Sequence, residues 1–97
     1  MTAYIIADID VHDEDTYMDY VRLAPAHIAR FGGEYVIRGG NAAAFEGDWC
    51  PTRFVVVRFP SKEQATALLA DPDYQAVAEI RKSSTTSKLI VAEGFEG

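Results

Sequence analysis

Two arginines and one aspartate occupy positions at which a folded chain could hold an acidic ligand. Asp8 lies near the end of the first apolar segment, Arg38 ends a second, and Arg53 begins a third. If these segments are neighbouring strands, the three charges meet at one end of a sheet. Arg38 would offer a bidentate contact to a carboxylate or an enolate there. The alternative is a structural salt bridge at the sheet edge. We predict a ligand-binding role for all three residues.

A second acidic group lies in the segment between Arg38 and Arg53, where Glu46 and Asp48 flank a glycine beside the only tryptophan, Trp49. A carboxylate in an apolar cavity can act as a general base. We therefore predict Glu46 as a catalytic residue and Trp49 as a ligand contact. Ordinary turn chemistry, with Trp49 covering the core, is the alternative.

His27 is predicted to lie on the flank of a helix, beside its apolar stripe, where it could act as a general acid or base. A partly exposed helix residue is the alternative reading. A histidine without clustered carboxylates is a poor metal signal, and Cys50, the only cysteine, cannot form an intrachain disulfide or a cysteine cluster. We predict that no metal and no cofactor takes part, so any chemistry would be cofactor-free.

Hydrophobic periodicity predicts the elements that position these residues. The apolar side chains of the first segment alternate, which is typical of a strand with one buried face. In chain order the pattern predicts a strand at 3–10, a helix at about 14–31, a strand at 34–38 continuing through 42–46, a strand at 53–59, a short helix from 61 to about 70, a helix from 72, and a strand at 88–93.

Helix boundaries follow from capping residues. Asp13 is a good N-cap for the first helix, and Ser61 with Gln64 resembles a capping box. Asp71 followed by Pro72 predicts the start of the last helix. Pro25 lies inside the first helix and removes the hydrogen bond to the Val21 carbonyl, so we expect a kink or a brief break there.

This order, β-α-β-β-α-β, predicts an α+β, ferredoxin-like fold. A right-handed crossover would place the third strand between the first two, with the helices on one face of a four-stranded antiparallel sheet. The other face would expose apolar residues, which favours a homodimer that packs sheet against sheet as a dimeric α/β barrel. The exposed residues would come from Tyr4, Ile6, Val36, Phe54, Val56, Ile90 and Ala92.

Length and charge narrow the function classes. A chain of 97 residues predicts a single domain over 1–97, and its net charge of −6 argues against nucleic acid and against an anionic membrane surface as partners. The N-terminal segment resembles neither a secretory signal nor a membrane span, so we expect a cytoplasmic location. The glycines at 39 and 40 lie between strand-like segments, which argues against a phosphate-binding loop.

Several spaced motifs resemble one bacterial family. They are LAPAHIARFGGEYVIRGG, EGDW followed by Pro51 and Arg53, VVVRFPSKEQA, and DPDYQAV. Together they are similar to the family known as domain of unknown function 1330, a member of the dimeric α/β-barrel superfamily. The resemblance implies a ferredoxin-like fold and a homodimer, and it implies no established reaction. The wider superfamily includes cofactor-free monooxygenases, isomerases, stress-responsive proteins and haem enzymes.

The leading hypothesis is a homodimer that binds a small aromatic or carboxylate-bearing molecule beside the sheet, with acid/base chemistry by Glu46 or His27 as an extension. Whether the protein is an enzyme stays open at this point. The alternatives are a non-catalytic binding or stress-response module, and a purely structural dimer. A deep cavity that contains Arg38 together with a carboxylate or a histidine would favour chemistry over the alternatives.

Overall fold

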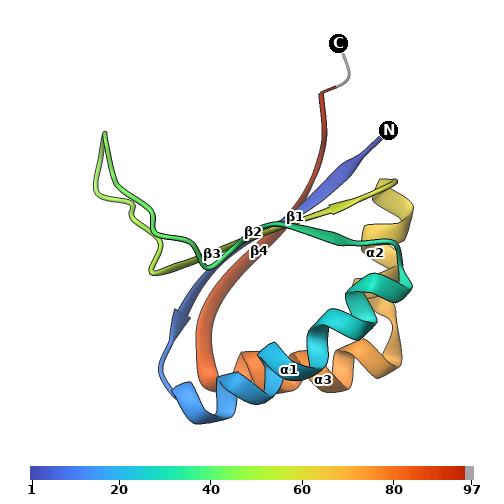
Figure 1. Ribbon diagram of the computed structural model, residues 1–97, viewed down its shortest axis with the longest axis horizontal. Coiled ribbons are helices and arrows are strands. Elements are labelled where there is room, and N and C mark those ends of the chain that lie inside the picture. Colours follow the sequence, from blue (N-terminus) through green and yellow to red (C-terminus); the bar gives the residue numbers. More distant parts are fainter. Residues whose placement is uncertain (96–97) are drawn as a thin grey trace.

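A computed structural model describes residues 1–95 of the chain. Within these residues four strands form one antiparallel sheet, and three helices lie on one side of it (Figure 1). In chain order the elements are β1 (Ala3–Val11), α1 (Glu14–Arg30), β2 (Glu34–Arg38), β3 (Arg53–Phe59), α2 (Lys62–Ala70), α3 (Pro72–Ser84) and β4 (Thr85–Glu93). No helix in this part of the chain is long and apolar enough to cross a membrane.

The strand order is β2-β3-β1-β4, so β3 and β1 are the central strands. All three neighbouring pairs are antiparallel. The connection from β1 through α1 to β2 leaves room for β3 between them, which is the split arrangement of a ferredoxin-like fold. The predicted fold class and strand order are confirmed.

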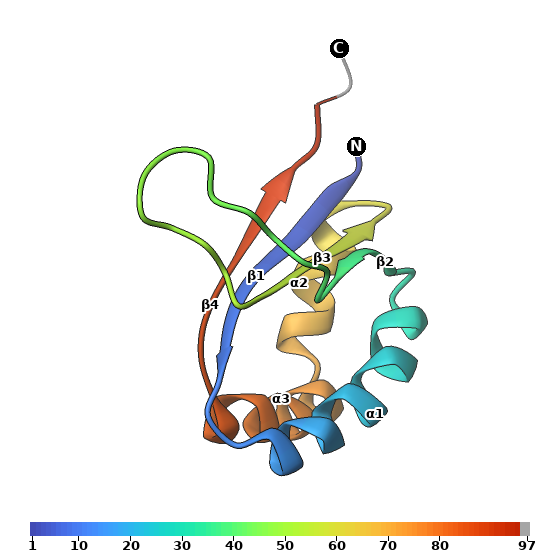
Figure 2. The same cartoon turned by 60° about the vertical axis from the view of Figure 1, so that its left-hand side comes forward.

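The core lies between the sheet and the helices. Side chains of β1 alternate as a strand requires, and those buried against the helices are Ala3, Ile5, Ala7 and Ile9. Ile5 pairs with Val57 of β3, and both pack with Ile28 of α1 and Leu68 of α2. Each buried aliphatic side chain of this size contributes about 1.5–3 kcal/mol relative to exposure. Figure 2 shows α1 and α3 side by side under this face of the sheet.

Capping side chains begin the helices where predicted. The Asp13 carboxylate accepts a hydrogen bond from the backbone N–H of Thr16, at 3.1 Å, and Asp71 accepts one from that of Tyr74, at 3.0 Å. Ser61 Oγ caps α2 by accepting from the backbone N–H of Gln64, at 3.2 Å. The side chain of Gln64 reaches back to Ser61, since its Oε1 accepts a hydrogen bond from Ser61 Oγ at 3.4 Å, and its Nε2 donates to the carbonyl of Phe31 at 3.2 Å.

Three local predictions are wrong. Residues 42–46 form no strand, because β3 begins only at Arg53 and offers them no partner; the whole segment 41–50 is exposed. Of the kink or brief break expected at Pro25, the break is absent, since α1 runs without interruption from Glu14 to Arg30. β4 begins at Thr85 rather than Lys88, since the β-branched Thr85 pairs with Val11 at the end of β1.

Candidate functional site

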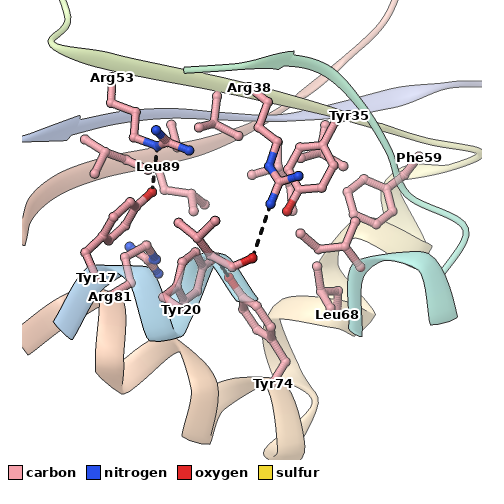
Figure 3. Close-up of a pocket in the computed structure, with 17 residues that line it drawn as sticks. Tyr17, Tyr20, Tyr35, Arg38, Arg53, Phe59, Leu68, Tyr74, Arg81 and Leu89 are labelled. Carbon is pink, nitrogen blue, oxygen red and sulfur yellow. Dashed lines mark hydrogen bonds between the residues drawn. The ribbon is translucent and has the colours of Figure 1, made fainter. Parts of the chain in front are cut away.

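A cavity lies between the sheet and the helices. It contains about 40 Å³ of free space, enough for about three water molecules. Arginines and tyrosines project into this space from both layers, as Figure 3 shows. The lining residues are Ile5, Ala7, Ile9, Tyr17, Tyr20, Val21, Ile28, Tyr35, Arg38, Arg53, Val55, Val57, Phe59, Leu68, Tyr74, Arg81 and Leu89.

Arg38 reaches the cavity because of a β-bulge in β2. Tyr35 pairs with Val57 and Arg38 pairs with Val55, so β2 uses three steps where β3 uses two. The extra residue turns Tyr35 and Arg38 to the same face of the sheet, whereas residues three apart in a regular strand face opposite sides. The Arg38 guanidinium carbon then lies 4.5 Å from the centre of the Tyr35 ring.

The exposed side chain of Arg38 also crosses from β2 to α1. Its Nη2 donates a hydrogen bond to the backbone carbonyl of Val21, at 3.2 Å (Figure 3). That carbonyl has no helical partner, because the residue four positions on is Pro25, which has no N–H. A proline in the helix thus supplies an anchor for an arginine at the rim of the cavity.

Arg53 begins β3 and points toward α1. Its Nε donates a hydrogen bond to the hydroxyl of Tyr17, at 3.0 Å, and its guanidinium carbon lies 5.3 Å from the centre of that ring. Gly39 leaves space for this side chain, since a Cβ there would lie 2.7 Å from Arg53 Nη1. Gly39 also has a φ of 71°, which favours glycine.

Arg81 of α3 is the most deeply placed of the three arginines that line the cavity, with 7% of its surface exposed. Its Nη1 donates to Ser87 Oγ at 2.8 Å, while its Nε is buried without a hydrogen-bond partner. The guanidinium carbon lies 5.8 Å from the centre of the Tyr20 ring.

Two tyrosine hydroxyls meet beside Arg81. Tyr20 Oη and Tyr74 Oη are 2.7 Å apart, so one donates to the other. Burial, reinforced by Tyr74, raises the pKa of Tyr20 far above its usual range. Burial also raises the pKa of Tyr35, although Arg38 acts in the opposite direction. Tyr20 and Tyr35 are therefore neutral at physiological pH.

The charged side chains of residues 1–95 that line the cavity are all positive. Among residues 1–95, its lining includes Arg38, Arg53 and Arg81 and no aspartate, glutamate or histidine. This contrasts with the whole chain, whose net charge is −6. The cavity therefore contains the predicted Arg38 without a carboxylate or an imidazole beside it, and its chemistry is that of an anion-binding site with aromatic walls.

The structure brings Arg38 and Arg53 together but separates them from Asp8. Asp8 pairs with Phe54, one position along from Arg53, so its side chain lies on the opposite face of the sheet. There its carboxylate accepts a hydrogen bond from Trp49 Nε1, at 2.8 Å. The predicted cluster of Asp8 with the two arginines is wrong, because neighbouring strand positions alternate between faces.

The other candidates also lie outside the cavity. Trp49 and Glu46 belong to the exposed segment between β2 and β3, which projects on the side of the sheet away from the helices (Figure 1). Trp49 packs edge-on against Phe54, with 6.0 Å between ring centres. His27 of α1 lies outside the cavity lining, with its ring 6.5 Å from that of Tyr74. The catalytic roles of Glu46 and His27 stay predictions.

Sequence reasoning did not assign Arg81 and Tyr74 to the cavity. Both lie on the buried face of α3 with Val77 and Ala78. The sequence did contain a signal for this role, because Arg81 recurs at helical spacing among apolar residues. An arginine is seldom buried without a partner, so one on such a face indicates a polar site. No group of three or more His, Cys, Asp or Glu side chains in residues 1–95 is arranged to hold a metal ion.

The fold and the cavity place the chain among small α+β proteins of ferredoxin-like topology. Residues 2–95 match the family described as Domain of unknown function (DUF1330), and the chain belongs to that family. No curated protein matches the chain at a significant level.

Solved structures of the same fold share little sequence with the chain. A protein of unknown function from Rhodopseudomonas palustris has a TM-score of 0.81 at 17% identity, with 99% of this chain and 84% of that one covered. A dimeric ferredoxin-like protein of unknown function from Jannaschia sp. CCS1 has a TM-score of 0.72 at 12% identity, covering 97% and 100%. SnoaB, a cofactor-independent oxygenase from Streptomyces nogalater, has a TM-score of 0.65 at 16% identity, covering 99% and 95%.

Proposed function

We propose that the protein binds a small aromatic carboxylate in the cavity between its helices and its sheet. The observation that carries this proposal is the lining: three arginines, four tyrosines and apolar side chains, with no acidic residue among residues 1–95. A carboxylate would pair with guanidinium donors, and an aromatic ring would pack against the tyrosines. Arg38 and Arg53 are the proposed anchors.

Entry of such a ligand requires side-chain movement, because 40 Å³ is too small for an aromatic ring. Arg38 is the residue that can open the cavity. Its side chain is exposed and is held to α1 by one hydrogen bond, to the Val21 carbonyl. Breaking a hydrogen bond made by a charged group costs about 1.5–3 kcal/mol, which the new ion pair offsets.

Binding, rather than catalysis, is the part of the hypothesis that the cavity supports. Tyr20 and Tyr35 stay neutral, and no carboxylate or imidazole of residues 1–95 lines the space to act as a base. Proton transfer by Glu46 or His27 would need either residue to approach a bound ligand. A non-catalytic binding or stress-response module is the alternative within the same proposal. The cytoplasmic location of the protein stays a prediction.

We further propose a homodimer that packs through the open face of the sheet. Ile90 and Val36 are 58% and 51% exposed there, while Tyr4, Ile6, Phe54 and Ala92 are partly exposed. Val56, which we had expected on this surface, is only 9% exposed. An apolar surface of this kind favours a partner, and the similar fold from Jannaschia sp. CCS1 is described as dimeric.

A thermal-shift screen with matched aromatic acids and amides tests the ligand proposal. At ten times its Kd a ligand stabilises the folded state by about 1.4 kcal/mol, which raises Tm by several degrees. We expect acids to raise Tm more than their amides, and we expect Arg38→Met and Arg53→Met to remove most of the rise. Asp8→Asn, on the opposite face, should keep it. Equal shifts for acids and amides would contradict the proposal.

A further inference from the structure

Arg81 is a buried charge that forms no ion pair with a carboxylate of residues 1–95. Its guanidinium has five N–H donors, and its hydrogen bond to Ser87 Oγ uses only one of its nitrogens. Among residues 1–95 the buried Nε has no hydrogen-bond partner, and no carboxylate lines the cavity between the sheet and the helices. Burying an unpaired charge is costly, so a chain that keeps one at this position has an incomplete site. The missing group must be an acceptor, because a guanidinium only donates.

The tyrosine pair next to Arg81 supplies a further donor. The two tyrosine hydroxyls carry two protons, and only one of these lies between Tyr20 Oη and Tyr74 Oη. The other proton is free to donate to a third group. Arg81 and this hydroxyl pair therefore present a positive charge and an O–H donor to the same space, within apolar walls.

We propose that Arg81, with the Tyr20 and Tyr74 hydroxyls, forms an inner oxyanion site that binds a weakly acidic phenol or enol as its anion. This inference rests on the proposed function, because it places the ionised oxygen of a ligand in the same cavity. On binding, the ligand's O–H bond breaks, its electron pair stays on oxygen, and the proton passes to the buffer. The site thereby lowers the pKa of the bound ligand.

The side chains of residues 1–95 around the proposed site are arginines, tyrosines and apolar groups. Within residues 1–95, α1 contributes Tyr17 and Tyr20, β2 contributes Tyr35 and Arg38, β3 contributes Arg53, and α3 contributes Tyr74 and Arg81. The lining residues of α2, β1 and β4 are apolar. A negative charge placed here therefore meets three positive charges and no negative one.

The test uses 4-nitrophenol, whose phenolate absorbs visible light and whose neutral form does not. Absorbance is recorded from pH 5 to 9 with the phenol free and with the phenol bound to excess protein. We expect the midpoint of the bound phenol to fall by at least one pH unit, which means that the phenolate binds at least tenfold more tightly than the phenol.

Variants assign the effect to Arg81. We expect Arg81→Met to remove the shift and Arg81→Lys to restore part of it. Arg22→Met removes the same charge from the exposed face of α1, where Arg22 pairs with Asp19, and should keep the shift. Ligand-free Arg81→Met should have a Tm at or above that of the wild type, because it removes an unpaired buried charge. That Tm also shows that the variant is folded.

The outcomes separate this inference from the proposed function. An unchanged or raised midpoint for the bound phenol overturns the inner site, as does a shift that survives in Arg81→Met. Binding of aromatic carboxylates without binding of 4-nitrophenol also overturns the inner site and leaves the proposed function intact. If neither class binds, both are wrong.

Discussion

Nη2 of Arg38 donates a hydrogen bond to the carbonyl of Val21 across 3.2 Å, and this carbonyl is the one that Pro25 leaves without a helical partner. A proline inside a helix is usually unfavourable because it removes a hydrogen bond and crowds the preceding turn. Here it frees an acceptor at the rim of the cavity. Pro25 therefore lowers the stability of the helix at the position where Arg38 of β2 is held.

Replacing Pro25 tests this relationship. Pro25→Ala supplies the missing N–H to the Val21 carbonyl and relieves the crowding, so we expect the free energy of unfolding to rise by about 1–3 kcal/mol. The measurement is urea denaturation. Pro72→Ala is the matched control, since a proline in the first turn of α3 is favourable and its removal should not stabilise the protein. A Pro25→Ala variant no more stable than the wild type would contradict this reading of the helix.

The strand order could be predicted from periodicity together with the right-handed crossover rule, whereas the face on which Arg38 lies could not. Alternation along β1 places Ile5 and Asp8 on opposite faces of the sheet. Once the register of β1 with β3 is known, the same rule predicts that Asp8 and Arg53 also lie on opposite faces. Arg38 depends on the bulge after Tyr35, which adds one residue to β2. A bulge is fixed by pairing with a distant strand and has little local signature in this segment.

The burial of Arg81 escaped prediction for a different reason. Arg81 lies on the buried face of α3 with Tyr74. Whether that face meets a partner chain or the inside of the same chain depends on how α3 packs on α1, and spacing alone does not decide this. The exposed position of Glu46 likewise follows from the absence of a strand opposite residues 42–46.

Gly39 should tolerate no side chain. Its φ of 71° costs a non-glycine residue about 1–2 kcal/mol, and a Cβ would lie 2.7 Å from Arg53 Nη1. We expect Gly39→Ala to lower the free energy of unfolding by at least that amount, as measured by chemical denaturation. Gly40→Ala is the control, because no atom lies within 4 Å of the position of its Cβ. Equal stability of the two variants would show that Gly39 and Arg53 are not packed as described.

Tyr20 should make stability depend on alkaline pH. Burial raises its pKa in the folded state, so the unfolded chain loses this proton first, near the usual tyrosine pKa of about 10. The stability that protonated Tyr20 contributes to the folded state is fully present below that pH. It is lost as pH rises toward the folded pKa, by up to about 1.4 kcal/mol per pH unit. We expect Tyr20→Phe to be less stable than the wild type at pH 7, where the bond to Tyr74 is lost, and the difference to shrink between pH 9.5 and 11. A constant difference across this range would exclude the effect.

The open face of the sheet should hold the dimer together. Ile90, 58% exposed, lies on this face in β4, and a lysine there would place a charge in the proposed interface. We expect Ile90→Lys to be monomeric by light scattering at concentrations where the wild type is dimeric. Ala76→Lys adds the same charge to the exposed surface of α3 and should leave the dimer unchanged. Monomeric wild-type protein at micromolar concentration would exclude this interface.

The proposed function depends most directly on where a ligand binds. The decisive measurement is a crystal structure of the wild-type protein with an aromatic carboxylate selected by the thermal-shift screen. We expect its carboxylate within hydrogen-bond distance of Arg38 or Arg53, its ring among the tyrosines of the cavity, and the bond between Arg38 and the Val21 carbonyl broken. A ligand seated instead beside Trp49 on the opposite face of the sheet, with the cavity unchanged, would contradict the proposed function.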